Sequence, residues 1–205
     1  MAVNIAIPKA WNDYVTQTNL GLEVVPSMLY DTLTYTDNST TRLRFFQQTN
    51  VALDISNMKS AGQLTNPESF LIQNLSIYFR TSVATDDSGA AGAFPSQFNN
   101  IVLLANTGIA TLTIGNKNYG PWPIWRLPAA TFAKGALAVA GAEAANLAHD
   151  YAQLDGPLYG LLPNLMISPL QAFVLELSWP SGAVDLTGNV VIQALFDGQL
   201  ARSIQ

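Results

Sequence analysis

The chain has 205 residues, of which 49% are hydrophobic and only 11% are charged, and its formal net charge is −5. A chain of this length can form one domain with a substantial core, and this composition excludes a disordered chain, which needs low hydrophobicity and high net charge. Soluble domains typically carry about 25% charged residues, so Asn, Gln, Ser and Thr must supply most of the polar surface.

The cysteine count and the basic residues exclude further classes. The chain has no cysteine, which removes disulfides, thiol catalysis and cysteine-ligated zinc. The nine basic residues are dispersed, and the closest pair is Arg42 and Arg44. A nucleic-acid-binding surface needs clustered Lys and Arg, so we expect no direct, sequence-specific contact with nucleic acid.

The first 40 residues contain few periodic signals and are interrupted by Pro8 and Pro26. We interpret 1–40 as an N-terminal arm that contains a short strand at Thr32–Tyr35. The remainder, 41–205, is expected to form a single domain.

Strand signals recur through that domain. The clearest is 70–80, where Leu71, Leu75, Ile77 and Phe79 alternate with polar residues and are expected to share one face. The segment from Tyr119 is expected to pair with 109–114, although its prolines cannot donate to a ladder. In 109–114 and 170–179 every second residue is likewise apolar, so Leu112 and Leu175 are expected to point inward. The other strand signals lie at 43–49, 101–105, 157–167 and 189–196.

Two connecting segments stand out. The segment 81–100, rich in Gly, Ala, Ser and Asp, is expected to be a long surface loop. The segment 131–151 is the one candidate helix, because Leu137, Ala140, Ala144, Leu147 and Tyr151 recur at helical spacing.

Seven or eight strands, long loops and one helix predict an all-β fold, an antiparallel β-sandwich. Because the strands are far apart in the sequence, we expect a jelly roll with the helix inserted at about 131–151.

Residues with catalytic potential are few. His149, the only histidine, has no identifiable nucleophile as a partner. Asp86 and Asp87 lie in a Gly/Ser segment without a calcium-loop pattern, and no phosphate-binding glycine motif occurs. We therefore expect no enzyme activity, no cofactor and no metal site.

The aromatic segment Tyr119–Arg126 is the most distinctive feature, because Trp122 and Trp125 alternate with proline next to Arg126. Such residues can form a sugar-stacking or peptide-binding surface. They are also enriched at subunit contacts, and the low charge of the chain favours this second interpretation. We take Trp122, Trp125, Arg126 and the near-terminal Arg202 as subunit-contact candidates.

The strand pattern, the lack of catalytic groups and the C-terminal segment VVIQALFDGQLARSIQ (190–205) resemble a viral jelly-roll capsid protein. The similarity covers 40–205 and is to the capsid subunits of tailless icosahedral bacteriophages with an internal membrane. It implies a coat subunit in the virion that forms trimers or larger capsomers with itself, binds other virion proteins and contacts a lipid membrane. The chain lacks the basic arm that would neutralise a genome.

Two functions therefore follow from the sequence. The first is a structural virion protein that assembles into an icosahedral shell without catalysis. The alternative is a carbohydrate- or peptide-binding β-sandwich, such as a receptor-binding or lectin-like module. A hydrolase that uses His149 ranks last.

Overall fold

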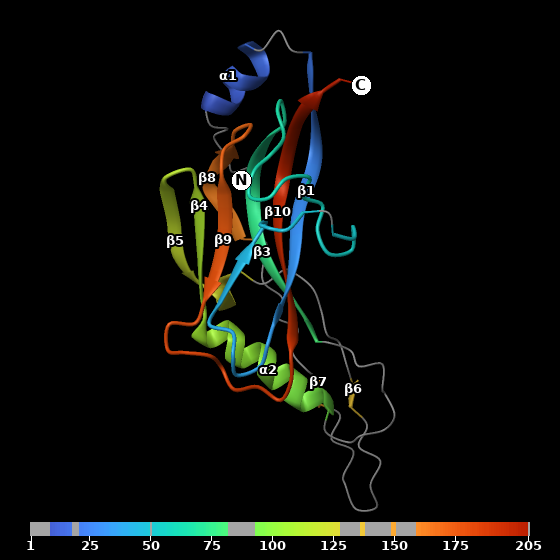
Figure 1. Ribbon diagram of the computed structural model, residues 1–205, viewed down its shortest axis with the longest axis vertical. Helices are drawn as coiled ribbons and strands as arrows, with labels where there is room; N and C mark the ends of the chain where they lie inside the picture. The colour runs from blue at the N-terminus through green and yellow to red at the C-terminus, as the bar shows by residue number, and fades with distance from the viewer. Residues whose placement is uncertain are drawn as a thin grey trace, which may run out of the picture.

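A computed structural model of the chain describes residues 9–17, 21–49, 51–81, 93–127, 136–137, 149–150 and 159–204. These residues form two four-stranded sheets, a small two-stranded sheet, two α-helices and one short 3-10 helix (Figure 1). The first sheet, sheet A, has the order β1-β10-β3-β8, and the second, sheet B, has the order β2-β9-β4-β5. Sheet A comprises β1 (Leu22–Tyr35), β10 (Val190–Ser203), β3 (Ser69–Thr81) and β8 (Tyr159–Ile167), and sheet B comprises β2 (Arg42–Phe45), β9 (Phe173–Ser178), β4 (Ile109–Ile114) and β5 (Lys117–Pro123).

The strand order is that of a jelly roll. Every neighbouring pair in the two sheets is antiparallel. The chain crosses repeatedly between the sheets, so β1, β3, β8 and β10 lie in sheet A and β2, β4, β5 and β9 lie in sheet B. Eight strands joined in this way in two packed sheets form a jelly roll. The predicted all-β sandwich is confirmed.

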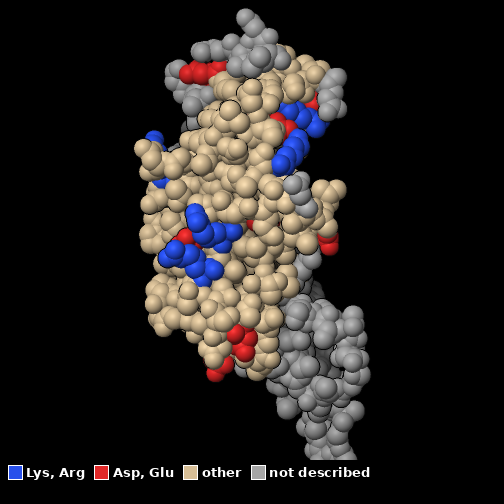
Figure 2. All heavy atoms as spheres, viewed as in Figure 1, with Lys and Arg blue, Asp and Glu red and all other residues tan. Residues whose placement is uncertain are grey.

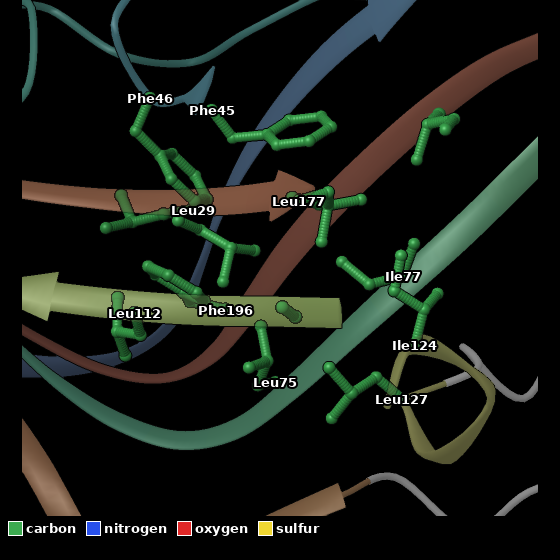
Figure 3. Close-up of a cluster of buried hydrophobic side chains, with 14 of the residues drawn as sticks. Leu29, Phe45, Phe46, Leu75, Ile77, Leu112, Ile124, Leu127, Leu177 and Phe196 are labelled. Atoms are coloured by element: carbon green, nitrogen blue, oxygen red, sulfur yellow. The ribbon is translucent and has the colours of Figure 1, made fainter. Parts of the chain in front are cut away.

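The main core lies between the two sheets and follows from period-two alternation. In β4 and β9 every second residue is buried, and the same is true of the first half of β10. Phe46, Phe173 and Phe196 meet at the centre, with ring centroids of Phe46 and Phe196 4.4 Å apart (Figure 3). Alternation thus predicted the inward faces of β4 and β9 correctly.

Strand β1 is longer than the sequence indicated. The strand expected at Thr32–Tyr35 is confirmed, but it begins at Leu22 and pairs with β10 along its whole length. Pro26 fits because β1 is an edge strand, where a missing N–H breaks no ladder. The sandwich therefore includes residues that the sequence assigned to an arm.

One bulge in β3 reverses which of its side chains face the main core. Ile72 pairs with Gly198 and Asn74 with Asp197, so Gln73 is an extra residue opposite two consecutive residues of β10. As a result Leu71 does not share a face with Leu75, and that prediction was wrong. Leu71 instead joins Ala201 on the outer face of sheet A.

Helix α1 (Lys9–Gln17) covers this outer face through Trp11, which is buried against Leu71 and Ala201. We call these three residues the Trp11 cluster. Helix α2 (Ala93–Thr107) lies at the opposite end of the sandwich (Figure 1). Neither helix, in the part of the chain that the structure describes, is long and apolar enough to cross a membrane.

Two predictions about the connections were wrong. The segment 93–100, expected to be loop, begins α2, and Pro95 fits there because the first turn of a helix needs no N–H from it. Within the expected helix at 131–151, the described residues form the antiparallel strands β6 (Ala136–Leu137) and β7 (His149–Asp150). Gly135 and Gly141 each lower helix stability by about 1 kcal/mol, which offsets the apolar stripe. The rest of that segment lies outside the described residues.

Candidate functional site

The four contact candidates lie in three environments. Trp122 belongs to β5, opposite Ala110, and packs half-buried against the main core. Trp125 lies in the short helix η1 (Ile124–Arg126) with 53% of its surface exposed, and the Arg126 guanidinium lies 5.8 Å from its ring centroid. Arg202 is in β10, where its Nε lies 2.6 Å from a carboxylate oxygen of Glu23.

The structure therefore brings only two of the four subunit-contact candidates together. Trp125 and Arg126 form one exposed pair, whereas Trp122 anchors β5. Arg202 lies in the other sheet, near the C-terminus and at the end of the molecule far from α2 (Figure 1).

Local packing fixes η1 so that Trp125 points outward. The buried residues Ile124 and Leu127 flank it, and the Leu127 carbonyl accepts a hydrogen bond from the Ile77 N–H (2.6 Å). The Ile124 N–H donates to the Gly108 carbonyl (3.1 Å). A Cβ at Gly108 would lie 2.4 Å from the Ile124 side chain, so glycine is needed for this close approach of η1 to the end of α2.

Six of the eight large exposed hydrophobic side chains among the described residues lie in two regions. Leu103 of α2 (43% exposed) and Trp125 lie on two elements that pack against each other, and with Arg126 we call them the α2–η1 group. Val24 and Met28 lie on β1, and we call them the β1-edge group together with Leu53 and Ile55 of the adjoining loop. Exposed apolar groups of this kind mark interaction surfaces.

Sequence reasoning missed most of these residues. Leu103 lies in the apolar run 101–105, which was expected to be a strand; that prediction was wrong, because the run belongs to helix α2. Leu53 and Ile55 flank Asp54 in the short apolar run 51–55, for which no helix or strand was expected.

The free edge of β1 is closed to a further strand. The Asn57 side chain accepts a hydrogen bond from the Tyr30 N–H (2.9 Å) and donates one to the Met28 carbonyl (2.7 Å). Gln48 Nε2 donates to the Thr32 carbonyl (3.0 Å). The backbone groups that a new strand would need are thus occupied between residues 28 and 32.

The other three edge strands carry different obstacles. Pro163 lies in β8, and Pro121 and Pro123 lie in β5. Strand β2 has only four residues and carries Arg42 and Arg44. Proline, charge and shortness are the features that protect sheet edges from unwanted pairing.

The buried carboxyl of Asp31 has a structural role. Its Oδ2 accepts a hydrogen bond from the Phe46 N–H (2.5 Å), which holds Phe46 in a positive-φ conformation (φ 68°) at the end of β2. Desolvation by burial raises the pKa of Asp31, and it likewise raises that of Asp197 in β10. Asp31 thus stabilises the turn that places Phe46 in the main core.

The residues considered for catalysis or metal binding form no site that can be described. His149 lies in β7 opposite Leu137, and its side chain is outside the described part of the structure, as are Asp86 and Asp87. Among the described residues, no three His, Asp or Glu side chains are grouped so as to hold a metal.

The chain matches no protein-family model, no curated protein and no solved structure with which it was compared.

Proposed function

We propose that this chain is a structural virion protein, a coat subunit that assembles with copies of itself into an icosahedral shell and catalyses no reaction. The observation that supports it best is a jelly roll that exposes large apolar side chains while its strand edges are blocked. Jelly rolls occur in both viral capsid proteins and lectins, so the fold alone does not distinguish these functions and the choice between them depends on the surface residues.

The surface favours association through side chains. Only 11% of the residues are charged, and interface cores are depleted in charge. Trp and Arg are enriched at energetically important contacts, which makes the exposed Trp125–Arg126 pair the first contact candidate. Leu103 on the adjoining helix extends it. Arg202, already paired with Glu23, is a weaker candidate, and Trp122 is a structural residue.

The experiment is light scattering over a concentration series, with negative-stain imaging of the same fractions. Trimers, larger capsomers or closed shells are expected. Trp125→Ala should shift assembly to higher protein concentration, whereas Leu170→Asn should not, because the exposed Leu170 lies outside both apolar groups. A strict monomer at every concentration would refute the proposal.

One observation favours the second function. An exposed Trp stacked with Arg is also a surface on which a sugar ring can pack. A glycan array screen, followed by titration of the protein with the bound glycans and with peptides, tests this, with Trp fluorescence as the measured signal. Saturable quenching in a non-assembling protein that is lost in Trp125→Ala would favour the binding module.

Contact with other virion proteins and with an internal lipid membrane belongs to the same proposal. Flotation of the assembled protein with vesicles tests the lipid part. Co-flotation that persists at high salt is expected if apolar side chains make the contact.

A further inference from the structure

The outer face of sheet B carries few charged residues apart from those where β2 pairs with β9. Residues 174, 176 and 178 of β9 and residues 111 and 113 of β4 alternate with buried positions and therefore point outward. Among them only Glu176 is charged. Figure 2 shows one cluster of Lys and Arg in the middle of the visible face, with an acidic group inside it.

That cluster consists of Arg42, Arg44 and Glu176, and we call it the arginine face. Arg42 Nε lies 3.2 Å from one oxygen of the Glu176 carboxylate, and Arg44 Nε lies 3.8 Å from the other. The two arginine side chains remain 63% and 59% exposed. Two guanidinium groups share one carboxylate through their Nε atoms, so the cluster keeps a positive charge and directs free N–H donors to solvent.

An opposite charge lies at one end of the sandwich. Asp37 and Asp185, which we call the acidic corner, lie in two segments that are joined by backbone hydrogen bonding of Asn38 to Val184 (3.3 Å). The Leu186 N–H also donates to Asp37 Oδ1 (2.6 Å). Asp185 is exposed, and no ion pair to either carboxylate occurs among the described residues.

We propose that the arginine face of one copy binds the acidic corner of a second copy. This proposal rests on the proposed function, because a coat subunit must recognise other copies of itself. Carboxylates are the groups that two exposed guanidiniums bind best. A two-fold contact that brought two arginine faces together would oppose like charges, which disfavours it.

The resulting contact is head-to-tail, since different surfaces of the two copies meet. Contacts of this kind repeat from copy to copy and produce closed rings or open chains according to the rotation between neighbours. A ring of this sort is a capsomer. The arginine face therefore supplies the specificity of the contact, and the apolar groups supply contact area beside it.

The test is a charge swap followed by sedimentation velocity. Arg44→Glu and Asp185→Lys should each weaken self-association roughly tenfold or more, because each replaces attraction by repulsion. The double variant should recover much of the loss. Lys117→Glu is the matched control, since it changes the net charge as Arg44→Glu does, at an exposed position at the start of β5. Raising the salt concentration should weaken wild-type association.

The outcomes separate this proposal from the proposed function. If the wild type assembles and Arg44→Glu assembles equally well, the arginine face is not the contact, and the coat function stands. The arginine face is likewise not the contact if both single variants lose self-association and the double variant does not regain it, although its thermal unfolding matches that of the wild type. A wild type that stays monomeric at low salt overturns both proposals.

Discussion

The sandwich has two hydrophobic cores that differ in size and construction. The main core is enclosed by both sheets and by parts of α2 and η1, whereas the Trp11 cluster is enclosed by one face of sheet A and one short helix. The same strands, β3 and β10, contribute to both cores, because the bulge turns Leu71 of β3 to the outer face and ordinary alternation places Ala201 of β10 there. Because these two strands are shared, a change in one core can be transmitted to the other. The main core nevertheless contains many more buried side chains than the Trp11 cluster. The main core should therefore control global unfolding, and the Trp11 cluster should control only the docking of α1.

Phe196→Ala should produce the largest effect on this comparison. Phe196 is fully buried in contact with Phe46 and Phe173, and Phe→Ala substitutions in cores cost about 3–5 kcal/mol. Urea denaturation followed by circular dichroism measures the loss. A loss below about 1 kcal/mol would show that the main core is not the cooperative unit.

Gly198→Ala should affect both cores, because Gly198 lies opposite the bulged segment of β3, where Leu71 and Ile72 face different cores. A Cβ there would lie 1.8 Å from the Leu71 carbonyl oxygen, so β3 and β10 would have to separate. We expect a loss of more than about 1 kcal/mol in the free energy of unfolding. Gly188→Ala is the control, because its added Cβ meets no atom within 4 Å. Equal stability of the two variants would contradict the close approach.

Trp11→Ala should produce a smaller and more local effect. The substitution removes the main contact of α1, and the release of one helix is a sub-global event. We expect global unfolding to change by about 1 kcal/mol or less, with a clear loss of amide protection in Lys9–Gln17. Hydrogen exchange measures the second quantity. A loss of protection throughout sheet A would mean that the two cores unfold together.

Asp31→Asn should change how the stability of the main core depends on pH. Burial raises the pKa of Asp31 above 3.8, so the folded protein holds this proton more tightly than the unfolded chain does. The stabilising contribution is complete below pH 3.8 and is lost as the pH rises through the folded pKa. The stability of the wild type relative to Asp31→Asn should therefore fall as the pH rises. Urea midpoints at a series of pH values test this, and a difference that is independent of pH would contradict it.

Alternation predicted the parts of the fold that have one buried and one exposed face. It located β4 and β9 together with their buried residues, such as Leu112 and Leu175. It misplaced Leu71, because a bulge depends on the partner strand and leaves no mark in a single segment. It missed most of β1, where Val24 and Val25 do not alternate and Pro26 interrupts the pattern.

The candidate site was predictable only where composition was unusual. The run of Trp, Pro and Arg drew attention to Trp125, but sequence gave no means of separating it from Trp122, since exposure depends on how η1 packs against Gly108. The arginine face depends on the pairing of β2 with β9, which brings Arg44 opposite Glu176 from 132 positions along the chain. Such long-range pairing is decided by tertiary structure.

The blocked strand edges limit the ways in which copies of this chain can associate incorrectly. A partner that joins a sheet through its backbone forms a ladder of cooperative hydrogen bonds, and such additions lead to fibres that grow without limit. Asn57 along β1 and the prolines of β5 and β8 obstruct that route on the described edges. Side chains then remain the means by which copies meet, and their individually weak contacts can break and re-form, so that a wrongly placed copy can leave before its neighbours lock it in.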